Sequence, residues 1–309
     1  MGSESREAAP GDNPGAVPPS RSEDTWTIGR LLSWTTDFLR KRGSESPRLD
    51  AEVMLASVLA WERVQLYTHY EDVVGEPERT RFRELVRRRA DGAPVAYLVG
   101  RKEFYSLRFD VSPAVLIPRP ESEFVIVELV EALKDQEEPR VVDVGTGSGC
   151  LAVAGAHQLS KARVTAIDIS PEALEVARKN AERHKLADRI EFLQGDLLAP
   201  LADAPPFDAI ISNPPYIPTA DLATLEPGVR DHEPALALDG GPDGLDVVRR
   251  LIRQAAPLLK PGGHLILEIG TAQEGPVRDL LSDARTWDLR PTTRDLQSHP
   301  RVVHATRAP

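Results

Sequence analysis

From about Arg119 onward, the sequence alternates short apolar runs with amphipathic stretches, and this alternation limits the possible folds more than any other feature. The apolar runs predict strands at 140–144, 163–168, 189–194, 207–212 and 263–269. The stretches between them predict helices at 121–134, 149–159, 171–184, 245–259 and 272–283. Such alternation is typical of a mostly parallel sheet with helices on both faces. We therefore expect an α/β domain over residues 119–309, with an antiparallel edge formed by short strands near Leu289 and Val302-Val303.

Three segments precede this domain. Residues 1–24 are rich in Pro, Gly, Ser and Glu and have almost no large apolar residues, which predicts a disordered tail. Residues 25–92 carry apolar residues at helical spacing and predict a small helical bundle. Residues 93–118 alternate in the manner of a β-hairpin that links the bundle to the α/β domain. The expected inward-facing residues of this hairpin are Phe104, Leu107, Phe109 and Val111.

A glycine-rich turn, Gly145-Thr146-Gly147-Ser148-Gly149, follows the predicted strand 140–144. Glycines allow a tight turn and let a ligand approach the backbone closely. The dinucleotide fingerprint G-x-G-x-x-G requires a glycine where this chain has Cys150, and a phosphate-binding P-loop requires Lys followed by Ser or Thr. The spacing G-x-G-x-G after Asp143 instead favours S-adenosylmethionine.

Two further carboxylates follow the next two predicted strands. Asp168 stands 25 residues after Asp143, where a βαβ unit holds a ribose diol. Asp196 follows strand 189–194, and there it is a candidate acceptor for the amino group of adenine. Any one of these aspartates alone is more often a helix cap or a loop carboxylate. Three acidic strand ends in order, with a polar motif at a fourth, favour a cofactor site.

The motif at the fourth strand end is Asn213-Pro214-Pro215-Tyr216. The Asn213 side-chain oxygen and the Pro214 carbonyl can each accept one N–H of a planar NH2 group. Both prolines fix φ near −65°, which holds that carbonyl in one direction, and Tyr216 offers a flat face for a flat substrate. Alone, the tetrapeptide is more often a proline-rich turn. Together with the glycine turn it favours the methylation of an amide or an aromatic amino group.

Several stretches resemble the protein-glutamine methyltransferases of the HemK/PrmC family, over about Pro47 to Val303. The most specific are Pro94-Val-Ala-Tyr-Leu-Val-Gly-Arg-Lys-Glu-Phe-Tyr105, Ile117-Pro-Arg-Pro-Glu-Ser-Glu123, Glu233-Pro-Ala-Leu-Ala-Leu238 and Asp243-Gly-Leu-Asp246. The resemblance implies a Rossmann-like S-adenosylmethionine-dependent methyltransferase domain with an N-terminal helical bundle and a connecting hairpin. It also implies methylation of the glutamine in the GGQ motif of peptide chain release factors, which would modulate translation termination.

The resemblance also assigns roles to individual residues. The expected contacts to S-adenosylmethionine are Gly145, Thr146, Gly147, Ser148, Gly149, Asp168, Asp196, Leu197 and Asn213. Asn213, Pro214 and Tyr216 are the expected catalytic residues, and with Pro215 they would bind the glutamine. Relatives often carry an aromatic residue where this chain has Leu197-Leu198, and leucine can still pack against the adenine. We expect direct displacement by the amide nitrogen without a histidine base, because proton loss can follow methyl transfer.

Composition narrows the class of protein further. The chain has 309 residues, a net charge of −10 and no apolar run near the roughly 18 residues of a membrane span. The acidic balance disfavours nonspecific binding to nucleic acid. The single cysteine, Cys150, excludes an internal disulfide and, with the lack of an apolar signal segment, predicts a cytoplasmic protein. The scattered histidines predict no metal site.

Some alternatives remain open at this point. The same tetrapeptide would serve a nucleic-acid amino methyltransferase acting on adenine or guanine, which would normally need a basic face. A noncatalytic cofactor-binding scaffold would tolerate degraded motifs, but both motifs are intact. A redox enzyme of porphyrin metabolism would need a set of cofactor ligands, and the sequence offers none. The arginines between Arg79 and Arg89 form either a solvated helix face or a docking surface. Arg119 and Glu123 either help to shape the acceptor mouth or form an ion pair that braces the domain junction.

Overall fold

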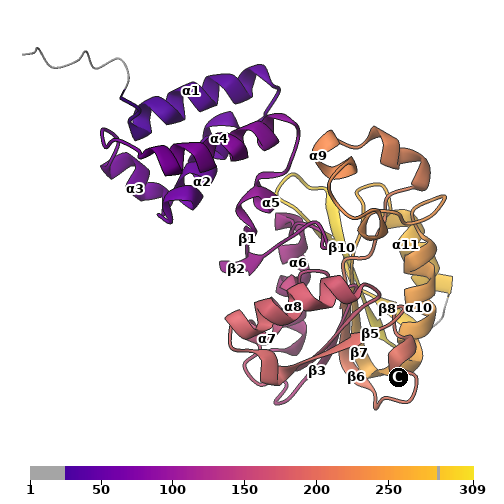
Figure 1. Cartoon of the computed structure of the whole chain (residues 1–309). Coiled ribbons are helices and arrows are strands. Elements are labelled where there is room, and N and C mark those ends of the chain that lie inside the picture. Colours follow the sequence, from indigo (N-terminus) through magenta and orange to yellow (C-terminus); the bar gives the residue numbers. More distant parts are fainter. Residues whose placement is uncertain (1–24, 284–285) are drawn as a thin grey trace, which may run out of the picture.

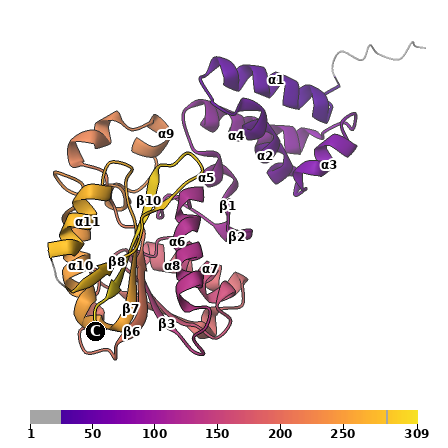
Figure 2. The ribbon, with the colours of Figure 1, turned by 180° about the vertical axis from the view of Figure 1, so that it is seen from behind.

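The computed structural model describes residues 25–283 and 286–309, so the tail predicted for residues 1–24 lies outside the described residues. Figures 1 and 2 show a lobe of helices set to one side of a larger α/β lobe. The helical lobe contains α1 (Ile28–Lys41), α2 (Pro47–Leu59), α3 (Arg63–Thr68) and α4 (Glu76–Ala90). It has a core of its own, because Leu32, Leu39, Met54, Leu55 and Leu66 are fully buried against one another.

The connection between the lobes begins with a helix rather than a strand. Residues Val95–Val99 form α5, which ends at Gly100 in the left-handed conformation with φ 71°. The hairpin is therefore shorter than the expected 93–118, with β1 at Arg101–Phe104 and β2 at Leu107–Asp110. Phe104 and Phe109 turn inward as predicted and pack on the core of the α/β lobe, whereas Leu107 is half-buried and Val111 packs in a small separate cluster.

The main sheet has the strand order β5-β4-β3-β6-β7-β10-β8, with β9 paired to β10. Its strands are β3 (Arg140–Val144), β4 (Arg163–Asp168), β5 (Ile190–Gln194), β6 (Phe207–Ser212), β7 (Leu259–Glu268), β8 (Trp287–Leu289), β9 (Thr293–Arg294) and β10 (Pro300–Arg307). Strands β3 to β7 pair in parallel, and β10 runs antiparallel between β7 and β8. The mostly parallel sheet and the predicted antiparallel edge are thus confirmed.

Helices cover both faces of this sheet, as the alternation predicted (Figure 1). One face carries α6 (Glu123–Leu133), α7 (Cys150–Gln158) and α8 (Pro171–Arg183), and the other carries α10 (Asp246–Leu258) and α11 (Glu274–Asp283). The short helix α9 (Pro227–Arg230) and several 3₁₀ turns fill the long connection from β6 to α10, where no element was predicted. In the described ranges, no helix is both long and apolar enough to cross a bilayer.

The strand order places a crevice next to β3. The chain runs outward from β3 to β4 and β5 and then returns to β6 on the other side of β3. Helices that leave neighbouring strands toward opposite faces open a crevice at such a reversal, and ligands of open α/β sheets bind there. The glycine turn follows β3, and Asn213 follows β6.

Candidate active site

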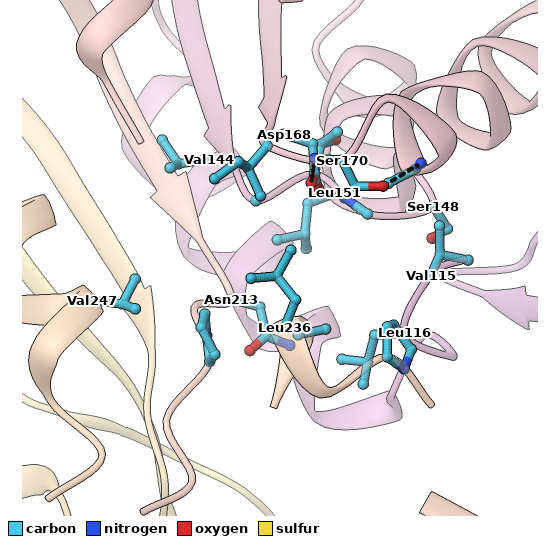
Figure 3. A pocket seen from close by; sticks show the side chains of 18 of the residues that line it. Val115, Leu116, Val144, Ser148, Leu151, Asp168, Ser170, Asn213, Leu236 and Val247 are labelled. Carbon is cyan, nitrogen blue, oxygen red and sulfur yellow. Dashed lines mark hydrogen bonds between the residues drawn. The ribbon is translucent and has the colours of Figure 1, made fainter. Parts of the chain in front are cut away.

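A cavity of about 340 Å³ lies at the carboxyl ends of β3, β4, β5 and β6. Pockets for small ligands typically range from roughly 300 to 1,000 Å³. The lining includes nine of the residues predicted from the sequence: Gly145, Thr146, Gly147, Ser148, Asp168, Asp196, Leu197, Asn213 and Pro215. Figure 3 shows Asp168 and Ser170 on one side of the pocket, Asn213 and Leu236 on another, and Val115 and Leu116 on a third. Gly149, Pro214 and Tyr216 lie outside this lining.

The glycine turn exposes backbone to the cavity in conformations that glycine adopts readily. Gly145 and Gly147 have φ values of 72° and 54°. The amide of Gly147 donates to Asp168 Oδ2 at 2.8 Å, which ties the turn to the end of β4. Gly149 has a different role, because a Cβ at this position would lie 3.0 Å from the Cβ of Ala177. That glycine lets α7 approach α8 closely.

Asp143, near the end of β3, stabilises the glycine turn through hydrogen bonds. Its Oδ2 accepts from Thr146 Oγ1 at 2.6 Å and from the Ala152 amide at 3.0 Å. Burial raises the pKa of this carboxyl to about 7. Its Oδ1 and the buried Ser148 Oγ find no hydrogen-bond partner among the described residues. Since buried polar atoms are nearly always paired, the Ser148 hydroxyl on the cavity wall is a candidate to bind a polar ligand.

The two predicted ligand carboxylates differ in their surroundings. Asp168 is half-buried, and its two oxygens accept from the amides of Gly147 and Ser170. Burial raises its pKa, and those amide donors oppose the increase. Asp196 is exposed and forms an ion pair with Arg250 on α10. Arg250 also lines the cavity and therefore holds the Asp196 carboxylate at its edge.

Asn213 is held in one orientation at the end of β6. The preceding residue, Ser212, donates its hydroxyl to the Val144 carbonyl at 2.7 Å and joins β6 to β3. The Asn213 Nδ2 donates to Ser122 Oγ at 3.0 Å, and Ser122 in turn donates to Glu268 Oε2 at 2.5 Å. The Asn213 side-chain oxygen therefore remains available to accept a hydrogen bond from a ligand.

The rest of the tetrapeptide lies deeper or to the side. Pro214 is buried and Tyr216 is half-buried. The Tyr216 carbonyl accepts from Gln273 Nε2 at 2.9 Å, and the same nitrogen donates to the Gly244 carbonyl at 3.1 Å. Burial raises the pKa of the Tyr216 phenol, so it is neutral at physiological pH. These contacts attach the motif to the loops that follow β7 and precede α10.

An ion pair with a buried carboxylate lies beside the cavity. Arg119, which lines the cavity, pairs with Glu233, and Glu233 Oε2 also accepts from the Ile117 amide at 3.1 Å. This pair joins the segment before α6 to the segment after α9. Glu123 does not line the cavity; its Oε1 accepts from the Tyr105 amide at 2.8 Å and braces the hairpin turn. Arg119 thus forms an ion pair, but with Glu233, whereas Glu123 forms none among the described residues, and a role of Arg119 in shaping the acceptor mouth stays a prediction.

Sequence reasoning missed four residues of this site. Ser122 and Glu233 stand within motifs that carried the family resemblance, but no role was assigned to them. Glu268 ends β7, one residue before the end of the predicted strand 263–269, and continues the series of polar strand ends, so that series was a signal for it. Arg250 had no such signal. Among the described residues, no group of three or more His, Cys, Asp or Glu is arranged to hold a metal ion.

Comparison with known proteins identifies the family. A family model described as the PrmC N-terminal domain matches residues 30–100, and one described as the methyltransferase small domain matches residues 127–226. The release factor glutamine methyltransferase of Rhodopirellula baltica is 46% identical, over 93% of this chain and 99% of that protein. The chain belongs to the release factor glutamine methyltransferase family.

A second member of this family, from Geobacter sulfurreducens, is 43% identical over 91% of this chain and 96% of its own length. Among solved structures, the hMettl16 catalytic domain has a TM-score of 0.54 at 18% identity, covering 77% of this chain and 84% of that one. At that identity the likeness shows only a shared methyltransferase fold. Family membership confirms the resemblance found in the sequence. It disfavours the alternative of a nucleic-acid amino methyltransferase.

Proposed function

We propose that this chain transfers a methyl group from S-adenosyl-L-methionine to the side-chain amide nitrogen of a glutamine in peptide chain release factors. One observation carries the proposal. The Asn213 amide lies on the wall of the cavity, its nitrogen is engaged by Ser122, and its oxygen is left to accept. A primary amide is the group that this acceptor and a neighbouring carbonyl would bind through two N–H bonds.

The residues around the cavity fit S-adenosyl-L-methionine. The cavity volume of about 340 Å³ falls in the range of small-ligand pockets, the glycine turn presents backbone without side chains, and the Ser148 hydroxyl has no hydrogen-bond partner among the described residues. We propose that Asp168 binds the ribose hydroxyls and that Asp196 and Leu197 bind the edge of the adenine. The glycine turn and Ser148 bind the polar amino-acid end of the cofactor. When bound, the cofactor supplies a methyl group made electrophilic by a sulfonium.

The chain itself then has to orient the glutamine. Asn213 Oδ1 accepts one amide N–H and the Pro214 carbonyl accepts the other, which prevents rotation of the NH2 group. Pro215 lines the cavity, and Tyr216 follows it outside the lining, with a neutral phenol that adds no charge near the acceptor. A protonated N-methyl amide is strongly acidic, so its proton passes to water and the chain needs no histidine base.

We assign release factor docking to the helical lobe, and the contacts favour its apolar surface over its arginines. Arg79, Arg81 and Arg87 each pair with a glutamate on their own helix, α4, which is typical of a solvated face. On α3, by contrast, Val64 and Tyr67 are three residues apart and are 66% and 54% exposed. Contiguous exposed apolar surface marks protein-binding sites, and we assign these two side chains to such a surface. We place the activity in the cytoplasm, which suits the free thiol of Cys150.

The test is a methyl-transfer assay with labelled cofactor, in which release factors, ribosomal proteins and RNA are offered side by side and the products are identified by mass spectrometry. We expect one methyl group on a release factor glutamine. Asn213→Ala should lower turnover by about 100-fold, the usual effect of losing a preorganised polar contact. Label on RNA alone, or an unchanged rate for Asn213→Ala, would refute the amide-binding proposal.

A further inference from the structure

We infer that Ser122 and Glu268 are positioning residues that orient the Asn213 amide so that its oxygen faces the acceptor cavity. This inference rests on the proposed function, because it concerns how the glutamine amide is bound. It assigns a task to two buried side chains, of which Ser122 lines the cavity and Glu268 lies behind it, outside the lining.

The three residues come from different elements. Asn213 follows β6, Ser122 ends a 3₁₀ turn before α6, and Glu268 ends β7. Ser212 is the register partner of Leu267, so the next residue on each strand, Asn213 and Glu268, leave the same edge of the sheet side by side. Ser122 lies between them, with bonds of 3.0 Å to Asn213 Nδ2 and 2.5 Å to Glu268 Oε2.

The direction of these bonds follows from counting protons. A serine hydroxyl has one proton, and an ionised carboxylate has none to give. Ser122 therefore donates to Glu268 and offers only lone pairs to Asn213, so the group facing it must be the amide nitrogen. If the Asn213 amide were rotated by 180°, its oxygen would face the Ser122 oxygen without a proton between them. Since Ser122 and Glu268 are each only 2% exposed, water does not replace the missing donor.

The orientation consequently depends on the charge of Glu268. A protonated Glu268 can donate to Ser122 Oγ, which frees the serine proton for the Asn213 oxygen and removes the preference. Burial raises the pKa of Glu268 to about 7. The ionisable groups that act on it are Glu121 and Arg119 before α6, Arg301 on β10, Tyr216 after β6 and Cys150 on α7. We therefore expect turnover of the parent protein to fall as the pH decreases through about 7.

The experiment uses the full chain, with a release factor as substrate, three variants of the two positioning residues and one control variant. Ser122→Ala should lower kcat by about 10- to 100-fold, the loss expected from a misoriented group, while the affinity for S-adenosyl-L-methionine measured by calorimetry stays within about twofold. Ser122→Thr keeps the hydroxyl and should restore most of kcat. Glu268→Gln should be slow at every pH and lose the decrease near pH 7. Thr36→Val removes a buried hydroxyl of the helical lobe and controls for stability.

Parental kcat in Ser122→Ala would overturn the inference, and so would an equal loss in Ser122→Thr, because that result would indicate packing rather than hydrogen bonding. If Ser122→Ala does not fold, the pH profiles decide: a decrease near pH 7 that persists in Glu268→Gln would overturn the inference, and its loss would support it. Failure of the parent protein to methylate any glutamine would refute the proposed function and the inference together.

Discussion

Gly149, at the start of α7, should be far less tolerant of substitution than its place in a glycine-rich turn implies. It has φ 78°, and a Cβ built on it would lie 3.0 Å from Ala177 Cβ and 3.1 Å from Ala177 Cα. Both atoms belong to the rigid frame of α8 and cannot rotate away. We therefore expect Gly149→Ala to force α7 and α8 apart.

Two terms set the size of the effect. A left-handed conformation costs a non-glycine residue roughly 1–2 kcal/mol, and overpacking of a tight contact costs about 1–3 kcal/mol more. The predicted loss in unfolding free energy is thus about 2–5 kcal/mol, a large part of the typical 5–15 kcal/mol. Gly262→Ala is the matched control, because Gly262 also has φ 78° and no described atom lies within 4 Å of its Cβ position. The Gly262→Ala variant should therefore lose only the roughly 1–2 kcal/mol cost of the left-handed conformation.

Urea unfolding followed by circular dichroism would measure both variants. Tryptophan fluorescence is less suitable, because Trp26, Trp34 and Trp61 all precede α4 and only Trp287 reports on the sheet. Hydrogen exchange should show faster opening of α7 in Gly149→Ala alone. If the two variants lose equal stability, the close approach of α7 to α8 does not constrain the fold and the reasoning is wrong.

Three further predictions concern other parts of the chain. Asp168→Ala should weaken S-adenosyl-L-methionine binding by about 1–3 kcal/mol in calorimetry, because the ribose hydroxyls lose their acceptor. Asp143→Asn should stabilise the unliganded protein progressively from pH 5 to pH 8, by on the order of 1–4 kcal/mol at the upper end in urea unfolding. The folded pKa of Asp143 is raised to about 7, so the stability that its neutral form contributes is lost as pH rises toward that value. Val64→Lys should reduce methylation of intact release factor but not of a short glutamine peptide, whereas Val127→Lys, on α6, should change neither rate.

Each of these has a clear contrary result. Unchanged affinity in Asp168→Ala would remove the ribose assignment and weaken that of the glycine turn. A stability difference between Asp143→Asn and the parent that is constant with pH would mean that Asp143 does not titrate in this range. Equal losses on peptide and on intact factor for Val64→Lys would argue against docking through α3.

The sequence was most informative where one physical requirement dominates. Strands β3, β4 and β6 have the predicted bounds because continuous apolar runs are needed to fill a sheet buried on both faces. The prediction of secondary structure was poorer where contacts with neighbouring segments determine the conformation. The run 95–99 contains β-branched residues and suggested a strand, but it forms α5, which Gly100 ends in a left-handed conformation. Helix α9 is too short for its periodicity to be recognised.

The same distinction holds within the site. The glycine turn, Asp168 and Asn213 were predicted because each chemical requirement is met by a local motif at a strand end. Ser122 and Glu268 are 91 and 55 positions from Asn213 in the sequence, and only the pairing of β6 with β7 brings Glu268 beside it. A hydrogen-bond chain of this kind leaves no spacing in the sequence, because its geometry is created by the sheet.

The reversal of strand order at β3 also separates two tasks within one cavity. The proposed cofactor contacts come mainly from β3, β4 and β5, and the groups that orient the acceptor come from β6, β7 and the segment before α6. Strand β3 touches both sets, since Ser212 donates to the carbonyl of Val144, directly before the glycine turn. Substitutions at Asp168 should therefore act on cofactor affinity, and those at Ser122 or Glu268 on turnover. Loss of the Ser212 hydroxyl should act on both, because it removes a side-chain bond that reinforces the backbone pairing of β3 with β6 between the two sets.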